Sequence, residues 1–417
     1  MAGCYRPAMT PDIRPVRQDE LPAYLDVLST AFLQRPDIER AARELWPMWQ
    51  DGRAWAARVD GRICGTFRSW PTELTVPGGA RLPAAAVAGV TVLPTHRRRG
   101  ILRSLVQVEH NAIRDHGQVL GLLHASEYPI YGRFGYGAAT REATWTIDAH
   151  RTGFHGTPEG SVEMAPLDDA TRDAMIAVYE TWRLGSPGEI RRRPTTWEYE
   201  LGRREPLWGP AWKGFVVLHR DAEGNVDGYA RYHAEERWEH GQPHNLAIVD
   251  DLHVVSEAAG AALWRFLAET DWIGEVKAGR RSPSDRVPWL LTNARAAVLT
   301  EVGDGLWVRI FDVVRALEAR RYDGSARFVL EIVDPEAPGG RVRVALDASP
   351  EGATCRVTGA SPDLTVGLAA LGASYLGGAR LRDAVLATGA DEHRPGALGV
   401  ADALLRTPDE PWCSTFF

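Results

Sequence analysis

The sequence predicts an α/β protein made of three successive parts, and three observations support this prediction. The chain has 417 residues, which is too long for one ordinary hydrophobic core. Strand and helix patterns alternate along residues 13–124 and again along 226–278, as they do in layered α/β structures. Beyond residue 300 the pattern changes to one helix, several strands and two short helices. We therefore expect domains at 1–150, 151–300 and 301–417.

In the first part, the spacing of apolar residues predicts each element in turn. A short strand over 13–17 precedes a helix over 21–32, because Leu21, Leu25, Leu28 and Phe32 recur on one helical face. Alternating apolar positions then predict strands at 54–59 and 63–67, the second continuing toward residue 76. The remaining elements are a strand at 87–93, a helix at 101–115, a strand at 119–124 and a turn-rich segment at 126–137.

The middle part repeats this order with a weaker signal. It contains predicted strands at 226–233, 246–255 and 274–278 and a helix at 257–270. The turn before this helix has no arginine, and its glycine, Gly260, lies inside the helical pattern. An anion site needs unpaired N–H groups together with positive charge. We therefore interpret this part as a degenerate copy of the first. The run Arg191-Arg192-Arg193-Pro194 lies elsewhere, and we interpret it as a solvated loop.

The last part has an α+β pattern. A helix over 311–320 is followed by strands at 326–333, 341–347 and 355–358, and residues 335–340 are typical of a hairpin turn. Two short helices are predicted at 381–388 and 398–406. Alone, this pattern also allows a lipid-binding domain.

Composition limits the classes of function. The net charge is −7 and 25% of residues are charged, which argues against a nucleic-acid partner. Cys4, Cys64, Cys355 and Cys413 are scattered, so neither a zinc site nor a disulfide framework is predicted, and a reducing cytoplasm fits best. The N-terminal sequence lacks the apolar core of a signal peptide. No apolar run of about 18 residues is present, and we expect no membrane span.

The most informative stretch is VAGVTVLPTHRRRGILRSLV, residues 87–106. An apolar strand leads through a basic loop with a glycine into the start of a helix. The first N–H groups of a helix have no partner within it, and the helix dipole adds positive potential there. Three arginines add full charges. The stretch therefore predicts a site for an anion such as a pyrophosphate.

A family resemblance enters at this loop. The hexad Arg97-Arg98-Arg99-Gly100-Ile101-Leu102 resembles the acetyl-CoA loop Q/R-x-x-G-x-G/A of the GNAT N-acetyltransferases, although Leu102 departs from the final Gly/Ala. The segment YGRFGYG at 131–137 and the C-terminal Phe417 extend the resemblance. Together they look like the Eis-type acetyltransferases of actinobacteria, over the whole chain. This implies two tandem GNAT-like domains, the second degenerate, followed by a sterol-carrier-protein-like domain.

The resemblance also implies which residues bind acetyl-CoA. The backbone of the strand at Val90, Thr91 and Val92 would pair with the pantetheine arm. The loop and first helical turn would hold the pyrophosphate through Arg97, Arg98, Arg99, Gly100, Ile101, Leu102 and Arg103. Ser126 and Glu127, after the next strand, would also contact the cofactor. No metal is expected.

Acetyl transfer to an amine requires a proton acceptor for the amine and a proton donor for the departing thiolate. Tyr131 is the candidate acid, because a phenol with a pKa of about 10 is protonated at neutral pH; Tyr136 is its competitor. By resemblance, the base is the α-carboxylate of Phe417. His96 and His124 could also act as bases, although a structural role is the simpler interpretation of each. Glu127 acting through water is the fallback.

The resemblance predicts direct transfer to a small molecule with several amines, such as an aminoglycoside, and a homo-oligomer, a hexamer in the family. The uncharged Thr415 and Phe416 near the C-terminus leave polycationic substrates open to question. Other hypotheses remain at this point: a protein-lysine acetyltransferase, a peptide N-terminal acetyltransferase, a CoA-binding sensor with low turnover, and a lipid carrier that uses the last domain.

Overall fold

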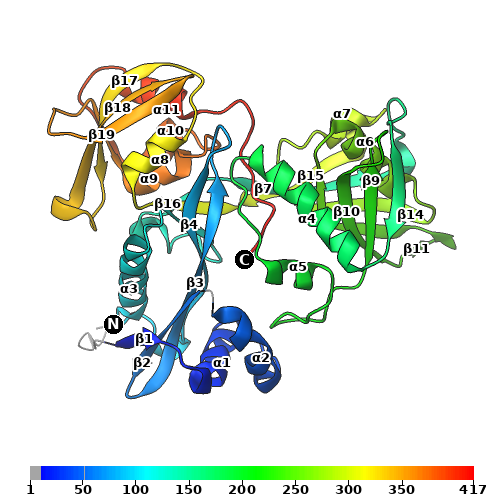
Figure 1. Ribbon diagram of the computed structural model, residues 1–417, viewed down its shortest axis with the longest axis horizontal. Helices are drawn as coiled ribbons and strands as arrows, with labels where there is room; N and C mark the ends of the chain where they lie inside the picture. The colour runs from blue at the N-terminus through cyan, green and yellow to red at the C-terminus, as the bar shows by residue number, and fades with distance from the viewer. Residues whose placement is uncertain (1–10, 51) are drawn as a thin grey trace.

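The computed structural model describes residues 11–50 and 52–417. The first sheet runs in the order β1-β2-β3-β4-β5-β16-β6 (Figure 1). Its strands are β1 (Asp12–Pro15), β2 (Arg53–Val59), β3 (Arg62–Thr75), β4 (Arg81–Val92), β5 (Leu120–His124), β6 (Gly137–Ala138) and β16 (Leu306–Ile310). Helices α1 (Leu21–Ala31), α2 (Ile38–Leu45) and α3 (Ile101–Asp115) accompany it. The predicted helices over 21–32 and 101–115 are confirmed, whereas α2 was not predicted.

The second sheet runs in the order β15-β7-β14-β13-β10-β9-β8. Its strands are β7 (Arg141–Asp148), β8 (Ser161–Ala165), β9 (Phe215–Arg220), β10 (Val226–Glu235), β13 (Asn245–Val254), β14 (Ile273–Arg281) and β15 (Ala297–Asp304). The helices of this region are α4 (Asp169–Leu184), α5 (Pro194–Glu200), α6 (Glu257–Glu269) and α7 (Val287–Leu290), and a small hairpin joins β11 (Trp238–Glu239) to β12 (Gln242–Pro243). The predicted elements between 226 and 278 are all present.

The third sheet runs in the order β19-β18-β17-β20-β21. Its strands are β17 (Ala326–Val333), β18 (Arg341–Ser349), β19 (Gly352–Val357), β20 (Leu364–Gly367) and β21 (Ala390–Glu392). Its helices are α8 (Val313–Ala319), α9 (Leu368–Ser374), α10 (Leu381–Thr388) and α11 (Ala397–Leu405). Strands β17 and β18 pair antiparallel, which confirms the hairpin predicted around 335–340.

The sheets do not follow the expected boundaries at 150 and 300. Strand β7 leaves the first part and pairs with β14 and β15 in the second sheet. Strand β16 returns to the first sheet, where Leu306 faces His124 of β5 and Trp307 faces Ala138 of β6. The first two parts are therefore interlocked by exchanged strands, and the chain between residues 141 and 304 forms an insertion into the first sheet.

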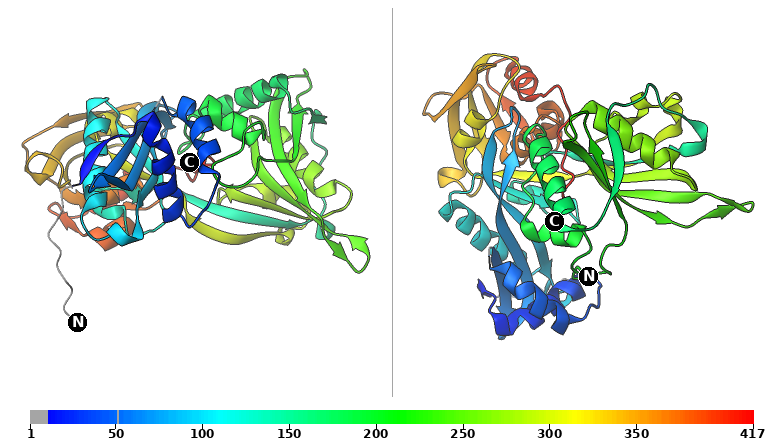
Figure 2. Two further views of the ribbon diagram at one scale, coloured as in Figure 1. Left: turned by 90° about the horizontal axis from the view of Figure 1, so that it is seen from below. Right: turned by 45° about the vertical axis from the view of Figure 1, so that its right-hand side comes forward.

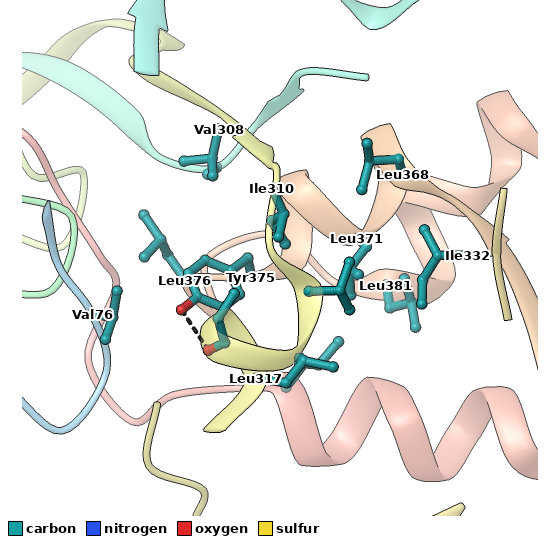
Figure 3. Close-up of a cluster of buried hydrophobic side chains, with 14 of the residues drawn as sticks. Val76, Val308, Ile310, Leu317, Ile332, Leu368, Leu371, Tyr375, Leu376 and Leu381 are labelled. Carbon is teal, nitrogen blue, oxygen red and sulfur yellow. Dashed lines mark hydrogen bonds between the residues drawn. The ribbon is translucent and has the colours of Figure 1, made fainter. Parts of the chain in front are cut away.

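The third part is joined to the first sheet by a shared apolar core. Val308 and Ile310 of β16 meet Leu371 of α9 and Leu317 of α8 in one buried cluster (Figure 3). Ile332 of β17 belongs to the same cluster. Because this cluster is close-packed with side chains from both parts, the third part is fixed rigidly against the sheet that carries the candidate site.

An ionic cluster closes the same interface. Glu336, in the turn between β17 and β18, accepts hydrogen bonds from His110 Nδ1 at 2.8 Å, Arg114 Nη2 at 2.6 Å and Arg309 Nη2 at 3.0 Å. Burial opposes ionisation of this carboxyl, but the hydrogen bond from His110, the charge of Arg309 and the hydrogen bond from Arg114 lower its pKa to about 2.

We expect Glu336→Gln to lower the free energy of unfolding by about 2 kcal/mol, the contribution of charge-assisted hydrogen bonds at a partly buried site. The pKa is lowered on folding, so the stabilisation is present above the ordinary value of 4.5 and is lost as the pH falls toward 2. Urea unfolding at neutral and acidic pH measures both effects. The exposed Glu351→Gln is the matched control and should leave the unfolding midpoint unchanged. Equal midpoints for the two variants would contradict a stabilising role of the Glu336 cluster.

Candidate functional site

The candidate site begins where β4 and β5 diverge. The two strands pair in parallel from Ala84 to Val87 on β4 and from Leu120 to Leu123 on β5. Beyond this point β4 continues to Val92 and keeps its antiparallel pairing with β3. The register of the β3–β4 pairing shifts between Thr66 and Arg68 of β3, next to Gly89 of β4. Gly89 has φ +57°, and the β-bulge at this position bends β4. The edge of β4 that faces β5 is thereby opened over Val90, Thr91 and Val92.

Helix α3 begins beside this opening. Gly100 is its N-cap residue with φ +82°, a conformation that favours glycine. Within the described residues no side chain caps the helix, so the N–H groups of its first turn stay available to a ligand. The helix packs closely on β3: a Cβ added at Gly65 would lie 3.2 Å from both Ile101 Cγ2 and Leu105 Cδ1. The start of α3 is therefore fixed next to the open edge of β4.

A cavity of about 900 Å³ joins these features. It is bounded by the end of α1, the open part of β4, the start of α3 and the segment after β5. Most of the predicted cofactor residues line it, namely Val90, Thr91, Val92, Arg97, Arg98, Gly100, Ile101, Leu102, Arg103, Ser126 and Glu127. The exception is Arg99, whose guanidinium donates to the Thr95 carbonyl at 3.2 Å and is not part of the lining.

The two candidate tyrosines differ in their access to this cavity. Tyr131 lines it, and burial, followed by the nearby Glu127 carboxylate, raises the pKa of Tyr131 to about 12. The hydroxyl of Tyr136 is buried and has no hydrogen-bond partner among the described residues, and this side chain is not part of the lining. Of the two tyrosines, Tyr131 is therefore the one that borders the cavity.

The C-terminus lies at the divergent end of β5. The ring of Phe417 contacts the His124 ring at 4.9 Å and the Trp70 ring at 5.7 Å between centroids. In all the views, the end of the chain lies between the first and second sheets (Figures 1 and 2). Ser126, two residues beyond His124, lines the cavity. The terminal residue is thus held by aromatic contacts next to the segment that borders the cavity.

His124 takes part in holding this tail. Its Nε2 lies 3.1 Å from the carbonyl oxygen of Thr415, and because a carbonyl only accepts, Nε2 carries the proton. Burial lowers the pKa of His124 to about 4, so the ring is neutral at pH 7. The structural interpretation of His124 is favoured over a role as base. His96 lines the cavity beside Arg97.

One sequence interpretation is wrong. The run Arg191-Arg192-Arg193-Pro194 is predicted to be a solvated loop, but its Arg192 is 6% exposed and donates a bidentate pair of hydrogen bonds to Asp251 at 2.6 and 3.1 Å. The local sequence RRRP gives no sign of this burial, because the carboxylate partner lies 59 residues away.

The described residues lack two features, a membrane-spanning helix and a cluster of metal ligands. No helix within residues 11–50 and 52–417 combines the length and the apolar character that a membrane span requires. The described part of the chain also contains no group of three or more His, Cys, Asp or Glu side chains that could hold a metal ion.

Known families match the chain in the order that the sequence predicts. Residues 12–139 match an acetyltransferase (GNAT) domain, and residues 188–310 match a second acetyltransferase (GNAT) domain. Residues 313–414 match a sterol carrier protein domain. These matches confirm the predicted fold class.

Relatives match almost the whole chain. An uncharacterized N-acetyltransferase of Streptomyces avermitilis is 40% identical over 413 residues, which are 97% of this chain and 98% of that protein. N-acetyltransferase Eis of Mycobacterium tuberculosis is 38% identical over 89% of this chain and 91% of its own length. The crystal structure of Eis1 from Mycobacterium abscessus has a TM-score of 0.84 at 34% identity, covering 97% of this chain and 100% of that chain.

Proposed function

This chain belongs to the Eis family of GNAT N-acetyltransferases, and from that premise we propose that it transfers the acetyl group of acetyl-CoA directly to an amine of a small polyamine such as an aminoglycoside. One observation carries the proposal: a cavity presents an open strand edge and an uncapped helix start, and the ring of the C-terminal Phe417 contacts His124, two residues before the Ser126 that lines this cavity. The first two features suit a CoA thioester, and the third supplies a carboxylate.

The residues fit acetyl-CoA by the chemistry of their donors. The N–H groups at the start of α3 and the guanidinium groups of Arg97 and Arg98 suit a pyrophosphate. The open backbone edge of Val90, Thr91 and Val92 suits the amide groups of a pantetheine arm. Acetyl-CoA supplies an activated acetyl group as a thioester; the protein supplies position and proton transfer.

In the proposed reaction, the Phe417 carboxylate accepts a proton from the substrate ammonium, which frees the nitrogen lone pair. The nitrogen attacks the thioester carbonyl carbon, the C–S bond breaks, and the second proton of the nitrogen is lost to water. Tyr131 donates its phenolic proton to the departing sulfur and is reprotonated by solvent. The products are an amide and CoA thiol, and no acetylated enzyme forms.

We expect Arg97→Ala to raise KM for acetyl-CoA by about tenfold and to leave kcat nearly unchanged, because one charge-assisted hydrogen bond contributes ~1.5 kcal/mol to binding. Initial rates at varied acetyl-CoA test this. Arg99→Ala is the matched comparison, since this guanidinium donates to Thr95 and lies outside the cavity lining. A larger effect at Arg99 than at Arg97 would contradict the assignment of the loop.

The acceptor is tested by product mass. The untagged protein is incubated with acetyl-CoA and, separately, an aminoglycoside, a linear polyamine, a lysine peptide blocked at its N-terminus and a peptide with a free N-terminus. The proposal predicts that the first two gain acetyl groups, the aminoglycoside at more than one position. Acetylation of the blocked peptide alone would replace the substrate class with protein lysine, and acetylation of the free N-terminus alone would replace it with peptide N-termini.

A further inference from the structure

The second sheet contains its own version of the divergence between β4 and β5. Strand β13 precedes helix α6 and strand β14 follows it, as β4 and β5 flank α3. The two strands pair in parallel up to Val249 on β13 and Ala278 on β14. Beyond this point β13 pairs with β10, and β14 pairs with β7. The strands of the second sheet therefore separate at the position that corresponds to the cavity of the first sheet.

The helix start beside this second opening is closed to an anion. The Ser256 hydroxyl caps α6 by accepting from Ala259 N–H at 3.0 Å, and it donates to Asp227 Oδ2 at 2.5 Å. A side chain thus takes the place that a phosphate would need, and a carboxylate lies behind it. The second opening has a different occupant.

That occupant is the chain's own C-terminal tail, residues 412–415. On one side, Trp412 Nε1 donates to the carbonyl oxygen of Arg280 on β14 at 2.8 Å. On the other side, the Ser414 hydroxyl lies 3.2 Å from His253 Nε2 on β13. The tail therefore bridges the two separated strands, and Figure 1 shows it running toward the centre of the molecule between the second sheet and the first.

The floor of this opening is a buried polar network that binds the tail. Arg192, already paired with Asp251, donates from Nε to the Thr415 hydroxyl at 2.9 Å and from Nη2 to the Ser414 hydroxyl at 3.2 Å. Glu189, which is fully buried, accepts from both the N–H and the hydroxyl of Ser414 at 2.7 Å. Buried charges are costly unless they are paired and hydrogen-bonded, and here the tail supplies several of the bonds.

Thr415 is bound by both domains at once. Its hydroxyl lies in the second-domain network, 2.9 Å from the Tyr179 hydroxyl, while its carbonyl accepts from His124 of the first sheet. Two residues separate it from the terminal carboxylate, a reach of at most about 7 Å. The position of Thr415 therefore limits where the Phe417 carboxylate can lie.

We propose that the divergence between β13 and β14 is a socket for residues 412–415, and that Arg192 and Glu189 are positioning residues that set the Phe417 carboxylate in the active site of the first domain. The proposal rests on the function assigned above to Phe417. The second GNAT domain thus serves catalysis by holding the tail in the opening that its counterpart uses for a ligand.

The test weakens the tail's own bonds in the full-length, untagged protein. Thr415→Val keeps the side-chain shape and removes the hydroxyl, Ser414→Ala is a second route to the same end, and Thr415→Ser is the conservative variant. Thr144→Val is the matched control, because it removes a hydroxyl bonded to Glu301 in the same sheet without touching the tail. Cys413 reports tail docking: it is 1% exposed, so an aqueous thiol reagent should modify it only after the tail leaves the socket.

The expected result for Thr415→Val and Ser414→Ala is a fall in kcat of about tenfold, consistent with misplacement of a catalytic group by less than about 1 Å. KM for acetyl-CoA should stay within about twofold of the wild-type value, since the cavity is unchanged. Modification of Cys413, followed by mass spectrometry, should become faster. Thr415→Ser should restore kcat, and Thr144→Val should change neither kcat nor the labelling rate.

The outcomes distinguish a failure of the socket proposal from a failure of the proposed function of Phe417, on which it rests. If adding one residue after Phe417 leaves kcat intact, the assignment of the carboxylate as base fails, and the socket loses its catalytic purpose with it. A second outcome is that the extension removes activity, while Thr415→Val and Ser414→Ala show faster Cys413 labelling than the wild type but keep the wild-type kcat. In that case only the positioning role of the socket is overturned. Unchanged labelling in both variants, with unchanged kcat, would also overturn it.

Discussion

Adding a single glycine after Phe417 is expected to reduce kcat by about 10²- to 10⁴-fold, the usual contribution of a positioned general base. The extension turns the α-carboxylate of Phe417 into an amide and moves the new carboxylate away by the length of a residue. The tail upstream keeps its contacts with Glu189 and Arg192, and KM for acetyl-CoA should change little. Thiol release at saturating substrates measures the effect.

Two matched proteins make this result specific. A glycine added before Met1 should leave kcat unchanged. Phe417→Leu keeps the carboxylate but loses the ring contacts with Trp70 and His124. Its kcat should therefore lie between that of the wild type and that of the extended protein. Full activity in the extended protein would exclude the terminal carboxylate as the base and would leave Glu127, acting through water, as the candidate.

Replacing Tyr131 by Phe is expected to reduce kcat by about 10²-fold or more through loss of the proton donor for the departing thiolate. The aromatic ring and its packing remain, so acetyl-CoA binding, measured by calorimetry, should be retained. Tyr136→Phe is the matched control, because that buried hydroxyl lies outside the cavity lining. Its kcat should stay near the wild-type value, and the reverse ranking of the two variants would assign the acid to Tyr136.

The pH dependence of kcat gives a second check on Tyr131. Its pKa is raised to about 12, so the phenol keeps its proton throughout the alkaline range in which an ordinary tyrosine, with a pKa of 10.0, would lose it. An alkaline decline of kcat caused by this group should therefore lie well above pH 10. A decline centred near 10 that disappears in Tyr131→Phe would contradict the buried position of the side chain.

Much of the cavity could be predicted because its determinants are local in the sequence. The strand, the basic loop and helix α3 are consecutive, and the glycine at the N-cap lies in the loop itself. The fold of each part could be predicted for the same reason, since apolar periodicity is a short-range property. The resemblance to a known family added the proposed role of Phe417, because the default expectation for a terminal residue is disorder.

The contacts that interlock the domains could not be predicted in this way. Strand β16 consists of four apolar residues and Arg309. Its place between β5 and β6 depends on strand partners that lie more than 160 residues away in the chain. Arg192 has the sequence context of a solvated loop, but Asp251 and the tail, both distant in the chain, pair with it, and the Tyr179 ring lies 4.1 Å from its guanidinium. Such features follow from tertiary pairing, which outweighs local composition.

The proposed acetyl transfer is tested most directly by the rate of thiol release from acetyl-CoA by the untagged protein, measured with and without an amine from the acceptor panel. Direct transfer predicts release only when both substrates are present, together with an acetylated amine of matching amount and no acetylated protein. Tight binding of acetyl-CoA without release in the presence of any amine would contradict the proposed function and would point to a CoA-binding sensor.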